Sequence, residues 1–219
     1  MLFADRADAG RQLAETLLAR LPGLVDQHPM VLGIPRGGVI IGREVARALG
    51  APLDVIVARK LGAPGHEELG IGAVAPDGTR VLDHEIVAAL AVSEAYIEKI
   101  TKRERAELDR RMHRFRDARP FPDLAGRAVV LADDGLATGV TARAALASVR
   151  RAQPAMLVFA APVCSEDGCR TLAAEGYTVV CVYTPSDFRG VGEWYADFEQ
   201  VTDETVIAVL RQAAEGPAT

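Results

Sequence analysis

Five short apolar runs constrain the fold of this chain more than any other feature. They are Met30–Ile34, Leu53–Ala58, Ala128–Ala132, Met156–Val163 and Thr178–Tyr183. None alternates regularly between apolar and polar residues, as a strand with one face in water does. Runs of this kind are typical of strands that are covered on both faces in a parallel sheet. The pattern therefore predicts a buried central sheet.

Helical patterns separate several of these runs. Val39–Leu49 has apolar residues at helical spacing and is followed by Gly50, a common stop signal. Ala142–Arg151 and Glu166–Glu175 follow the third and fourth runs. Strand and helix in alternation predict a doubly wound α/β fold. We expect the 219 residues, of which 49% are hydrophobic, to form one domain (1–219) with a sizeable core.

Two segments interrupt this rhythm. Residues 70–82 predict a hairpin that turns at Pro76-Asp77-Gly78. Residues 84–119 predict a long, polar helical insertion with Ser93 as an N-cap and an apolar stripe. We interpret the insertion as a surface helix or an oligomer contact. Its basic cluster is expected to be a solvated face, with a partner surface as the alternative: Arg110, Arg111, Arg114 and Arg116.

Charge and composition exclude several classes of protein. The net charge of −5 argues against a nucleic-acid surface, which usually has a basic excess. No stretch reaches the roughly 20 apolar residues of a membrane helix, and residues 1–11 lack an apolar signal core. We therefore expect a cytoplasmic protein with no membrane partner. The three cysteines, Cys164, Cys169 and Cys181, are odd in number and lack a histidine at zinc spacing, so inert thiols are expected.

Polar residues follow the apolar runs where a ligand would bind, because ligands lie outside the carboxyl ends of parallel strands. Cations, glycines, carboxylates and aromatic side chains come after four of the five runs. These groups are Arg36-Gly37-Gly38, Arg59-Lys60, Asp133 to Thr141, and Phe188 with Trp194 and Tyr195. The glycine-rich residues 61–70 are expected to be a flexible lid over this crevice.

The third group is the most informative. Asp133 and Asp134 can accept hydrogen bonds from two adjacent ribose hydroxyls and can approach a ribose-bound Mg²⁺. Residues 137–141 open a helix, where free amide groups suit a phosphate. Thr138 and Thr141 add hydroxyl groups there. An acid pair joined to a phosphate-binding loop predicts a site for a phosphorylated sugar.

Val129–Thr141 (VVLADDGLATGVT) resembles the signature of the type I phosphoribosyltransferases. The resemblance implies that Asp133 and Asp134 hold the ribose and, mainly through substrate and water, Mg²⁺. It implies a ribose-5-phosphate site that also includes Gly135, Ala137, Thr138, Gly139, Val140 and Thr141. Pro35-Arg36-Gly37-Gly38 is similar to the pyrophosphate loop of the family. That subsite would comprise Arg36, Gly37, Gly38, Arg59 and Lys60, with Lys60 also catalytic beside the acid pair.

The resemblance also implies an activity. Such an enzyme transfers the 5-phosphoribosyl group of phosphoribosyl pyrophosphate (PRPP) to a nitrogen acceptor, here a nucleobase, in purine or pyrimidine salvage. Phe188, Trp194 and Tyr195 would belong to a C-terminal hood (184–201) that stacks on the base, with ordinary packing as the alternative. Ala137 replaces the Asp of members that act on 6-oxopurines, which disfavours hypoxanthine and guanine. Family analogy suggests a homodimer. The alternative function is a PRPP-sensing regulator that binds nucleic acid through residues 110–116, which the acidic balance opposes.

Overall fold

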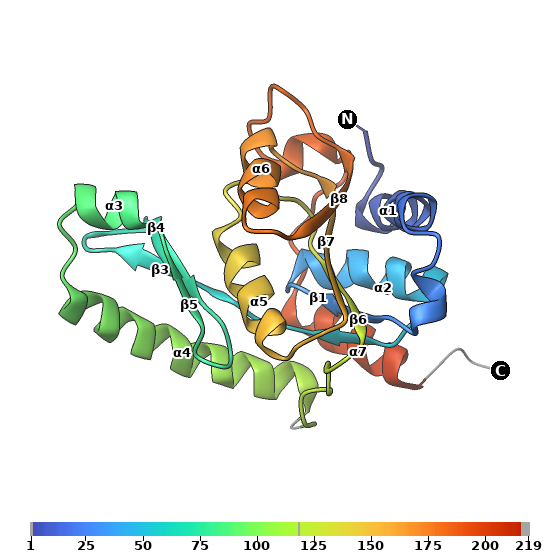
Figure 1. Cartoon of the computed structure of the whole chain (residues 1–219), viewed down its shortest axis with the longest axis horizontal. Coiled ribbons are helices and arrows are strands. Elements are labelled where there is room, and N and C mark those ends of the chain that lie inside the picture. The colour runs from blue at the N-terminus through green and yellow to red at the C-terminus, as the bar shows by residue number, and fades with distance from the viewer. Residues whose placement is uncertain (1, 118, 216–219) are drawn as a thin grey trace.

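The computed structural model of the chain describes residues 2–117 and 119–215. Five parallel strands form the central sheet in the order β2-β1-β6-β7-β8 (Figure 1). Their bounds are β1 Met30–Gly33, β2 Leu53–Val55, β6 Ala128–Ala132, β7 Met156–Val163 and β8 Thr178–Tyr183. All five predicted strands are confirmed, although the first two stop before the ends of their apolar runs.

Helices cover both faces of this sheet, so the doubly wound fold is confirmed. Alternate strand residues point to opposite sides: Val31, Val130 and Val158 pack with α1 and α2, whereas Leu32, Leu131 and Phe159 pack with α5 and α6. These helices are α1 Arg6–Arg20, α2 Gly37–Leu49, α5 Val140–Arg151 and α6 Glu166–Ala174. A short 3₁₀ turn, η1 Val25–Gln27, precedes β1.

Helix α1 is absent from the sequence-based prediction. Its start is nevertheless encoded, because the Asp5 side chain accepts a hydrogen bond from the Asp8 amide as an N-cap. Ala9, Leu13 and Leu17 are buried on one face. The helix therefore has both a start signal and an apolar stripe at helical spacing.

Residues 61–70, predicted to be a flexible glycine-rich segment, form strands, and their role as a lid stays a prediction. β3 Arg59–Ala63 pairs antiparallel with β4 His66–Val74, which pairs with β5 Arg80–Leu82 across the predicted turn at 76–78. Leu61, Ala63 and Ile71 are fully buried. Apolar burial outweighs the glycine content here, and it fixes the segment as part of a small second sheet.

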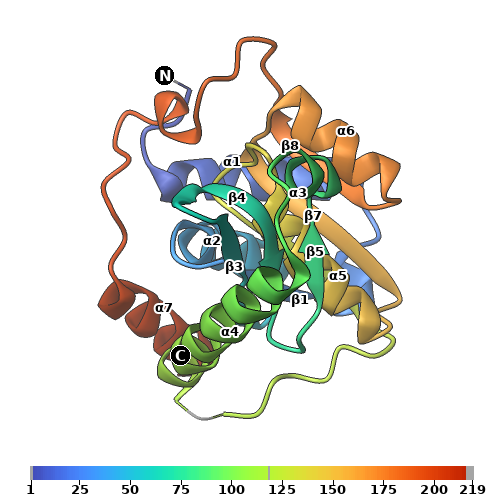
Figure 2. The same cartoon turned by 90° about the vertical axis from the view of Figure 1, so that its left-hand side faces the viewer.

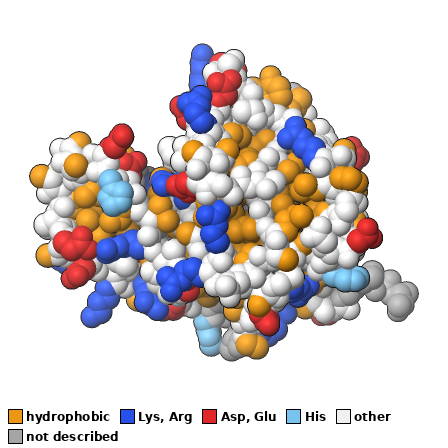
Figure 3. All heavy atoms as spheres, in the orientation of Figure 1, with side chains coloured by type: hydrophobic (Ala, Val, Ile, Leu, Met, Phe, Trp, Pro, Cys, Tyr) orange, Lys and Arg blue, Asp and Glu red, His pale blue; other side chains and the backbone are white. Residues whose placement is uncertain are grey.

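The predicted insertion is two helices, α3 His84–Ala89 and α4 Glu94–Arg116. The chain breaks at Ala91, which has a positive φ of 46°, and restarts at Ser93, whose side chain accepts from the Tyr96 amide as predicted. Residue 118, at the far end of the predicted insertion, lies outside the described residues. With the small sheet, α3 and α4 form a lobe beside the main body (Figure 1), and a notch separates the two in outline (Figure 3).

The apolar stripe of α4 packs inside the chain, and the interpretation of α4 as an oligomer contact stays a prediction. Ile97, Ile100, Leu108 and Phe115 are buried and share a cluster with residues of β3 and α7. α7 spans Asp203–Glu215, and the Thr202 hydroxyl accepts from the Thr205 amide at its start. The stripe therefore joins the lobe to the main body within one chain.

The prediction of a solvated arginine face is wrong for Arg116. Arg116 is buried and donates to both carboxylate oxygens of Asp54, at 2.9 and 2.7 Å. The other three arginines pair with acidic side chains on the surface, Arg110 and Arg111 with Glu107 and Arg114 with Asp203 and Glu204. The positive charge of this cluster is thus matched by carboxylates.

Two further features complete the fold. Residues 184–202 run along the outside of the molecule from β8 to α7 and include the 3₁₀ turn η2 Val191–Trp194 (Figure 2).

Cys164 and Cys181 form a disulfide between β7 and β8, so the prediction of inert thiols is wrong for this pair. In the part of the chain that the structure describes, no helix has the length and apolar character needed to cross a membrane.

The Arg116–Asp54 pair generates a stability prediction. Arg116→Met leaves the Asp54 carboxylate buried without its partner and should lower the free energy of unfolding by about 3 kcal/mol in urea denaturation. Arg110→Met removes an exposed arginine from the same helix and should have little effect. Equal losses in the two variants would contradict the assignment of Arg116 as the anchor of α4.

Candidate active site

The loops that follow β1 and β6 meet at the carboxyl end of the sheet. The two strands are adjacent, with Gly33 opposite Ala132. A Cβ atom on Gly37 would overlap the Asp134 carboxylate, and one on Gly38 would lie 2.9 Å from the Asp133 Cα. Glycine is therefore required at both positions by the close approach of the acid pair. The structure brings together two of the groups that the sequence predicts to converge.

The two carboxylates of the acid pair have different environments. The Asp134 amide donates to Asp133 Oδ1 at 2.8 Å, and the Asp134 carboxylate accepts from Arg6 Nε at 2.8 Å. Burial, and then the neighbouring charge of Asp134, raise the pKa of Asp133 well above its usual range. Asp133 therefore ionises reluctantly beside Asp134, and an added cation would favour its ionised form.

Arg6 is a site residue that sequence reasoning missed. Besides its ion pair with Asp134, its Nη1 donates to the Glu199 carbonyl at 2.8 Å, and its guanidinium lies 3.8 Å from the Phe198 ring centroid. Only 11% of the side chain is exposed. Arg6 therefore links α1, the acid pair and the C-terminal segment. No motif marks it, because its partner lies 128 residues away in the sequence.

Tyr195 lies behind the acid pair and has no free ring face. Its side chain is buried, and its hydroxyl donates to the Asp134 carbonyl at 2.6 Å. Burial raises the pKa of this phenol, so it remains a hydrogen-bond donor at neutral pH. The structure therefore gives Tyr195 a positioning contact in place of the predicted base stacking.

The other two predicted hood residues also pack toward the core. Phe188 and Trp194 are partly buried against the cluster under α1, and Trp194 contacts the Tyr183 ring at 5.0 Å between centroids. The most exposed aromatic side chains in this region are Tyr183 at 43% and Phe198 at 36%. The C-terminal segment also packs against the residue that follows the acid pair, because a Cβ on Gly135 would overlap the Val191 side chain.

The starts of α2 and α5 differ from those of the other α-helices in the described residues. α1, α3, α4, α6 and α7 each have an N-terminal side-chain cap, from Asp5, Asp83, Ser93, Ser165 and Thr202. α2 and α5 have none. These two helices follow the glycine loop 36–38 and the loop 137–141. Their first-turn amides are therefore left to a ligand, which suits an anion at each start.

The loop 137–141 is held from behind by α6. The Ser165 hydroxyl donates to the Ala137 carbonyl at 2.7 Å, and a Cβ on Gly168 would lie 2.6 Å from the same oxygen. Gly139 has a φ of 72° and leads directly into α5. Thr138 is exposed and Thr141 half-buried. The Ala137 carbonyl of the loop thus points into the protein, whereas the Thr138 side chain is exposed to solvent.

The predicted cations have different partners. Arg36 follows a cis peptide bond and is 34% exposed, with its Nη1 3.8 Å from Asp203 Oδ1. Arg59 donates twice to one Glu104 oxygen, at 2.8 and 2.6 Å, so its guanidinium is engaged by α4. Lys60 is exposed on β3, and its alkyl chain packs over Gly70. Arg36 is therefore the arginine of this set that is placed to meet an anion.

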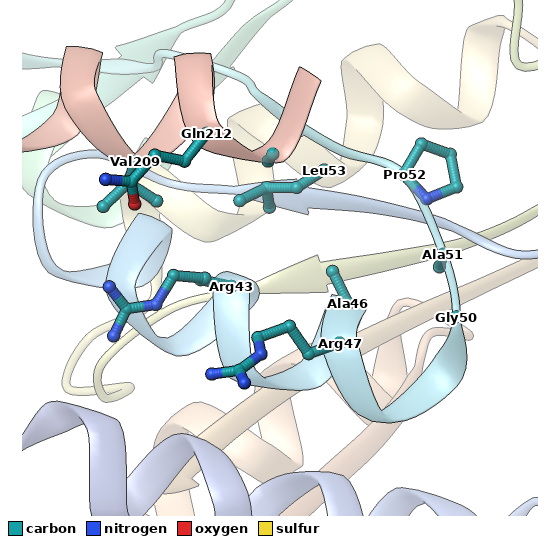
Figure 4. A pocket seen from close by; sticks show the side chains of 10 residues that line it. Arg43, Ala46, Arg47, Gly50, Ala51, Pro52, Leu53, Val209 and Gln212 are labelled. Atoms are coloured by element: carbon teal, nitrogen blue, oxygen red, sulfur yellow. The ribbon is translucent and has the colours of Figure 1, made fainter. Parts of the chain in front are cut away.

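A separate groove of about 900 Å³ lies at the opposite end of α2 (Figure 4). Arg43 and Arg47 of α2 line one side, and Val209 and Gln212 of α7 line the other. The acid pair lies at the start of α2, and the groove lies along its second half, from Arg43 to Gly50. The groove therefore does not belong to the site built by the strand-end loops.

Comparison with known proteins agrees with this geometry. The family model of the phosphoribosyl transferase domain matches residues 5–198. The Mycobacterium tuberculosis protein named "Putative phosphoribosyl transferase Rv0571c" is 43% identical over 212 residues, which are 97% of this chain and 47% of that protein. The chain thus spans about half the length of this relative.

Solved structures show the same similarity. The crystal structure of TT1426 from Thermus thermophilus is 44% identical, has a TM-score of 0.82 and covers 97% of this chain and 99% of its own. A hypothetical protein from Neisseria gonorrhoeae, solved with bound ppGpp, shares the fold at 13% identity and a TM-score of 0.53, with 96% of each chain covered. The family match includes both strand-end loops and Arg6, and the chain belongs to the phosphoribosyl transferase domain family.

Proposed function

We propose that the chain is a phosphoribosyltransferase that moves the 5-phosphoribosyl group of PRPP to a nitrogen acceptor and releases pyrophosphate. One observation carries the proposal. The acid pair lies between two helix starts, those of α2 and α5, that lack side-chain caps. PRPP has a diol with an anion on either side of it. Two anion sites flanking two carboxylates match that order of groups.

The loop 137–141 and the acid pair would each bind a different part of PRPP. The amides of 137–141 and the hydroxyls of Thr138 and Thr141 would hold the 5′-phosphate at the start of α5. Asp133 and Asp134 would accept hydrogen bonds from the ribose hydroxyls. Tyr195 and Arg6 would keep Asp134 in place from behind. The ribose would then be fixed between two rigid elements, which orients its anomeric carbon for attack.

The start of α2 would hold the leaving group. Breaking the anomeric C–O bond gives an oxocarbenium-like transition state, with negative charge growing on pyrophosphate. The Gly37 and Gly38 amides would face the leaving group from the helix start, and Arg36 supplies a partly exposed guanidinium beside them. Donors fixed where charge develops lower the barrier most. Lys60, on the lobe, would add a second cation, whereas Arg59 is engaged by Glu104.

The acid pair also fits a magnesium ion. Mg²⁺ prefers oxygen ligands and is often bound through one or two carboxylates plus substrate oxygens and water. Burial, and then the charge of Asp134, raise the pKa of Asp133, and a bound cation would favour its ionised form. When bound, Mg²⁺ would neutralise pyrophosphate oxygens. Asp133 and Asp134 would hold it, mainly through the substrate and water.

The acceptor is proposed to be a flat nitrogen base, in nucleotide salvage. Tyr183 and Phe198 offer aromatic surface on the C-terminal side of the site. The regulatory alternative, a PRPP sensor that binds nucleic acid, relied on the arginines of 110–116. Their pairing with Glu107, Asp203, Glu204 and Asp54 opposes it. The enzyme is therefore the better supported of the two functions.

Pyrophosphate release from PRPP and Mg²⁺ across a panel of nucleobases tests the function. Asp133→Asn and Asp134→Asn should each reduce turnover by at least about 100-fold while the far-ultraviolet circular dichroism stays unchanged. The matched control is Asp109→Asn, an exposed aspartate on α4. No release with any base, or full activity in both variants, would contradict the proposal.

The pH dependence of stability tests the state of the acid pair without substrate. Because the pKa of Asp133 is raised in the fold, the native state binds its proton more tightly than the unfolded chain. The contribution of Asp133 to stability is therefore present below its unfolded pKa, about 4, and is lost as pH rises through the folded pKa. Relative to Asp133→Asn, the wild type should lose stability in urea across that window. Parallel curves for the two proteins would show that Asp133 is not shifted.

Arg6 is proposed to hold the Asp134 carboxylate in place, aimed at the ribose. Arg6→Met should weaken PRPP binding by roughly tenfold, the value of one lost charge-assisted hydrogen bond, and Arg6→Lys should restore part of it. Calorimetric titration with PRPP and Mg²⁺ measures this. Arg11→Met, on the exposed side of the same helix, is the control. Tighter binding by Arg6→Met would mean that Arg6 obstructs the site.

A further inference from the structure

The three cysteines gather at one place beside the loop 137–141. Cys164 follows directly on β7, Cys169 lies in α6 and Cys181 lies in β8. Cys164 and Cys181 are bonded as a disulfide, and the Cys169 Sγ lies 3.8 Å from the Cys181 Sγ. All three sulfur atoms lie within 4.8 Å of one another. A free thiol thus stands in contact with a disulfide.

Exposure to solvent differs among the three. Cys164 is 0% exposed and Cys181 is 4% exposed, whereas Cys169 is partly exposed. An oxidant or reductant in solution therefore has no direct access to either sulfur of the bonded pair. Cys169 lies between solvent and Cys181. Thiol–disulfide exchange requires a thiolate to reach a disulfide sulfur, so access decides which cysteine reacts first.

We propose that Cys169 is the solvent-accessible thiol of a three-cysteine relay that forms and breaks the buried Cys164–Cys181 disulfide. From the reduced protein, the Cys169 thiolate attacks a small-molecule disulfide and releases one thiol. The Cys181 thiolate then attacks the Cys169 sulfur of this mixed disulfide and releases the second thiol. Finally, the Cys164 thiolate attacks Cys181, which closes the buried bond and returns Cys169 as a thiol. In sum, one external disulfide is reduced and two protein thiols are oxidised.

The geometry favours the relay over a metal site formed by the three cysteines. The central position of Cys181 fits the relay, because it is bonded to Cys164 and lies next to Cys169. A metal site would need free thiolates, but two of the three sulfurs are bonded to each other. Burial raises the pKa of the Cys169 thiol, and a hydrogen bond with Thr184 offsets part of this rise. Proximity to Cys181, not acidity, is therefore the main aid to the internal step.

The relay is attached to the proposed phosphate loop. The Leu136 amide donates to the Val163 carbonyl at 2.9 Å, and the Ser165 amide donates to the Leu136 carbonyl at 2.8 Å, so these bonds bracket Cys164. The Cys169 amide donates to the Ser165 carbonyl at 3.0 Å. Ser165 also holds the Ala137 carbonyl. Disulfide formation should therefore change the mobility of residues 136–139.

The first experiment measures the rate of oxidation. The protein is fully reduced, freed of reductant and exposed to glutathione disulfide, and Cys164–Cys181 is followed by mass spectrometry of alkylated peptides. Cys169→Ser should slow its formation by at least about tenfold, since the accessible step is lost. Thr171→Ser, an exposed change on the same helix, should not slow it. Oxidation of Cys169→Ser at the wild-type rate would overturn the relay.

A second experiment traps the intermediate. Cys164→Ser stops the relay one step early, so a Cys169–Cys181 disulfide should accumulate. Finding only the glutathione adduct on Cys169 would overturn the proposal, as would a reduced wild type that takes up one Zn²⁺ on three thiolates and resists oxidation. Amide hydrogen exchange at residues 136–139 should differ between oxidised and reduced wild type, and identical exchange would overturn the link to the loop. None of these measurements uses PRPP, so their failure is separate from failure of the proposed function.

Discussion

The rest of the site depends on the close approach of the two loops that follow β1 and β6. Gly37 and Gly38 let the backbone of one loop touch the carboxylates of the other, and any larger residue would displace the acid pair. This approach places two carboxylates side by side in a partly buried position, which is electrostatically unfavourable without compensation. Arg6 supplies part of that compensation through its ion pair with Asp134, and Tyr195 holds the Asp134 backbone carbonyl. Arg6 of the first helix thus contacts both the acid pair and the C-terminal segment, and so joins these two segments to the end of the sheet.

The cations of this acidic chain are mostly committed to holding the fold. Arg116 anchors α4 to β2 through Asp54, and Arg59 anchors β3 to α4 through Glu104. Arg36 differs, because its contact with Asp203 is 3.8 Å and its side chain is one-third exposed. A weakly held arginine at the start of an uncapped helix can move onto an anion at little cost. The weak contact of Arg36, rather than the number of arginines, therefore supports the proposed anion site at this helix start.

The sequence predicts the central sheet and the strand-end loops well, because burial on both faces leaves unbroken apolar runs, and ligand residues must follow them. It could not reveal Arg6, whose partner is 128 residues away, nor the positioning contact of Tyr195. The lid was predicted from glycine content, but the burial of Leu61 and Ile71 decides its structure. The disulfide was missed because the register of β7 and β8, which places Ala161 opposite Cys181, is not legible in spacing alone. Each of these features depends on a contact between residues that are far apart in the sequence, and local sequence patterns do not predict such contacts.

The lobe also packs against the helix that follows the loop 137–141, although the two are far apart in the sequence. Ala73 and Ala75 of the lobe side pack with Ala144 of α5, and Val140 at the start of α5 joins the same cluster. Small side chains let the two backbones come close, so the lobe cannot swing freely without disturbing the start of α5. Lys60 is on this lobe. In the proposed complex with PRPP, a phosphate at the start of α5 would therefore restrain both the loop and the strand that carries Lys60. Binding at one end of the ligand would then be coupled to the arrangement at the other.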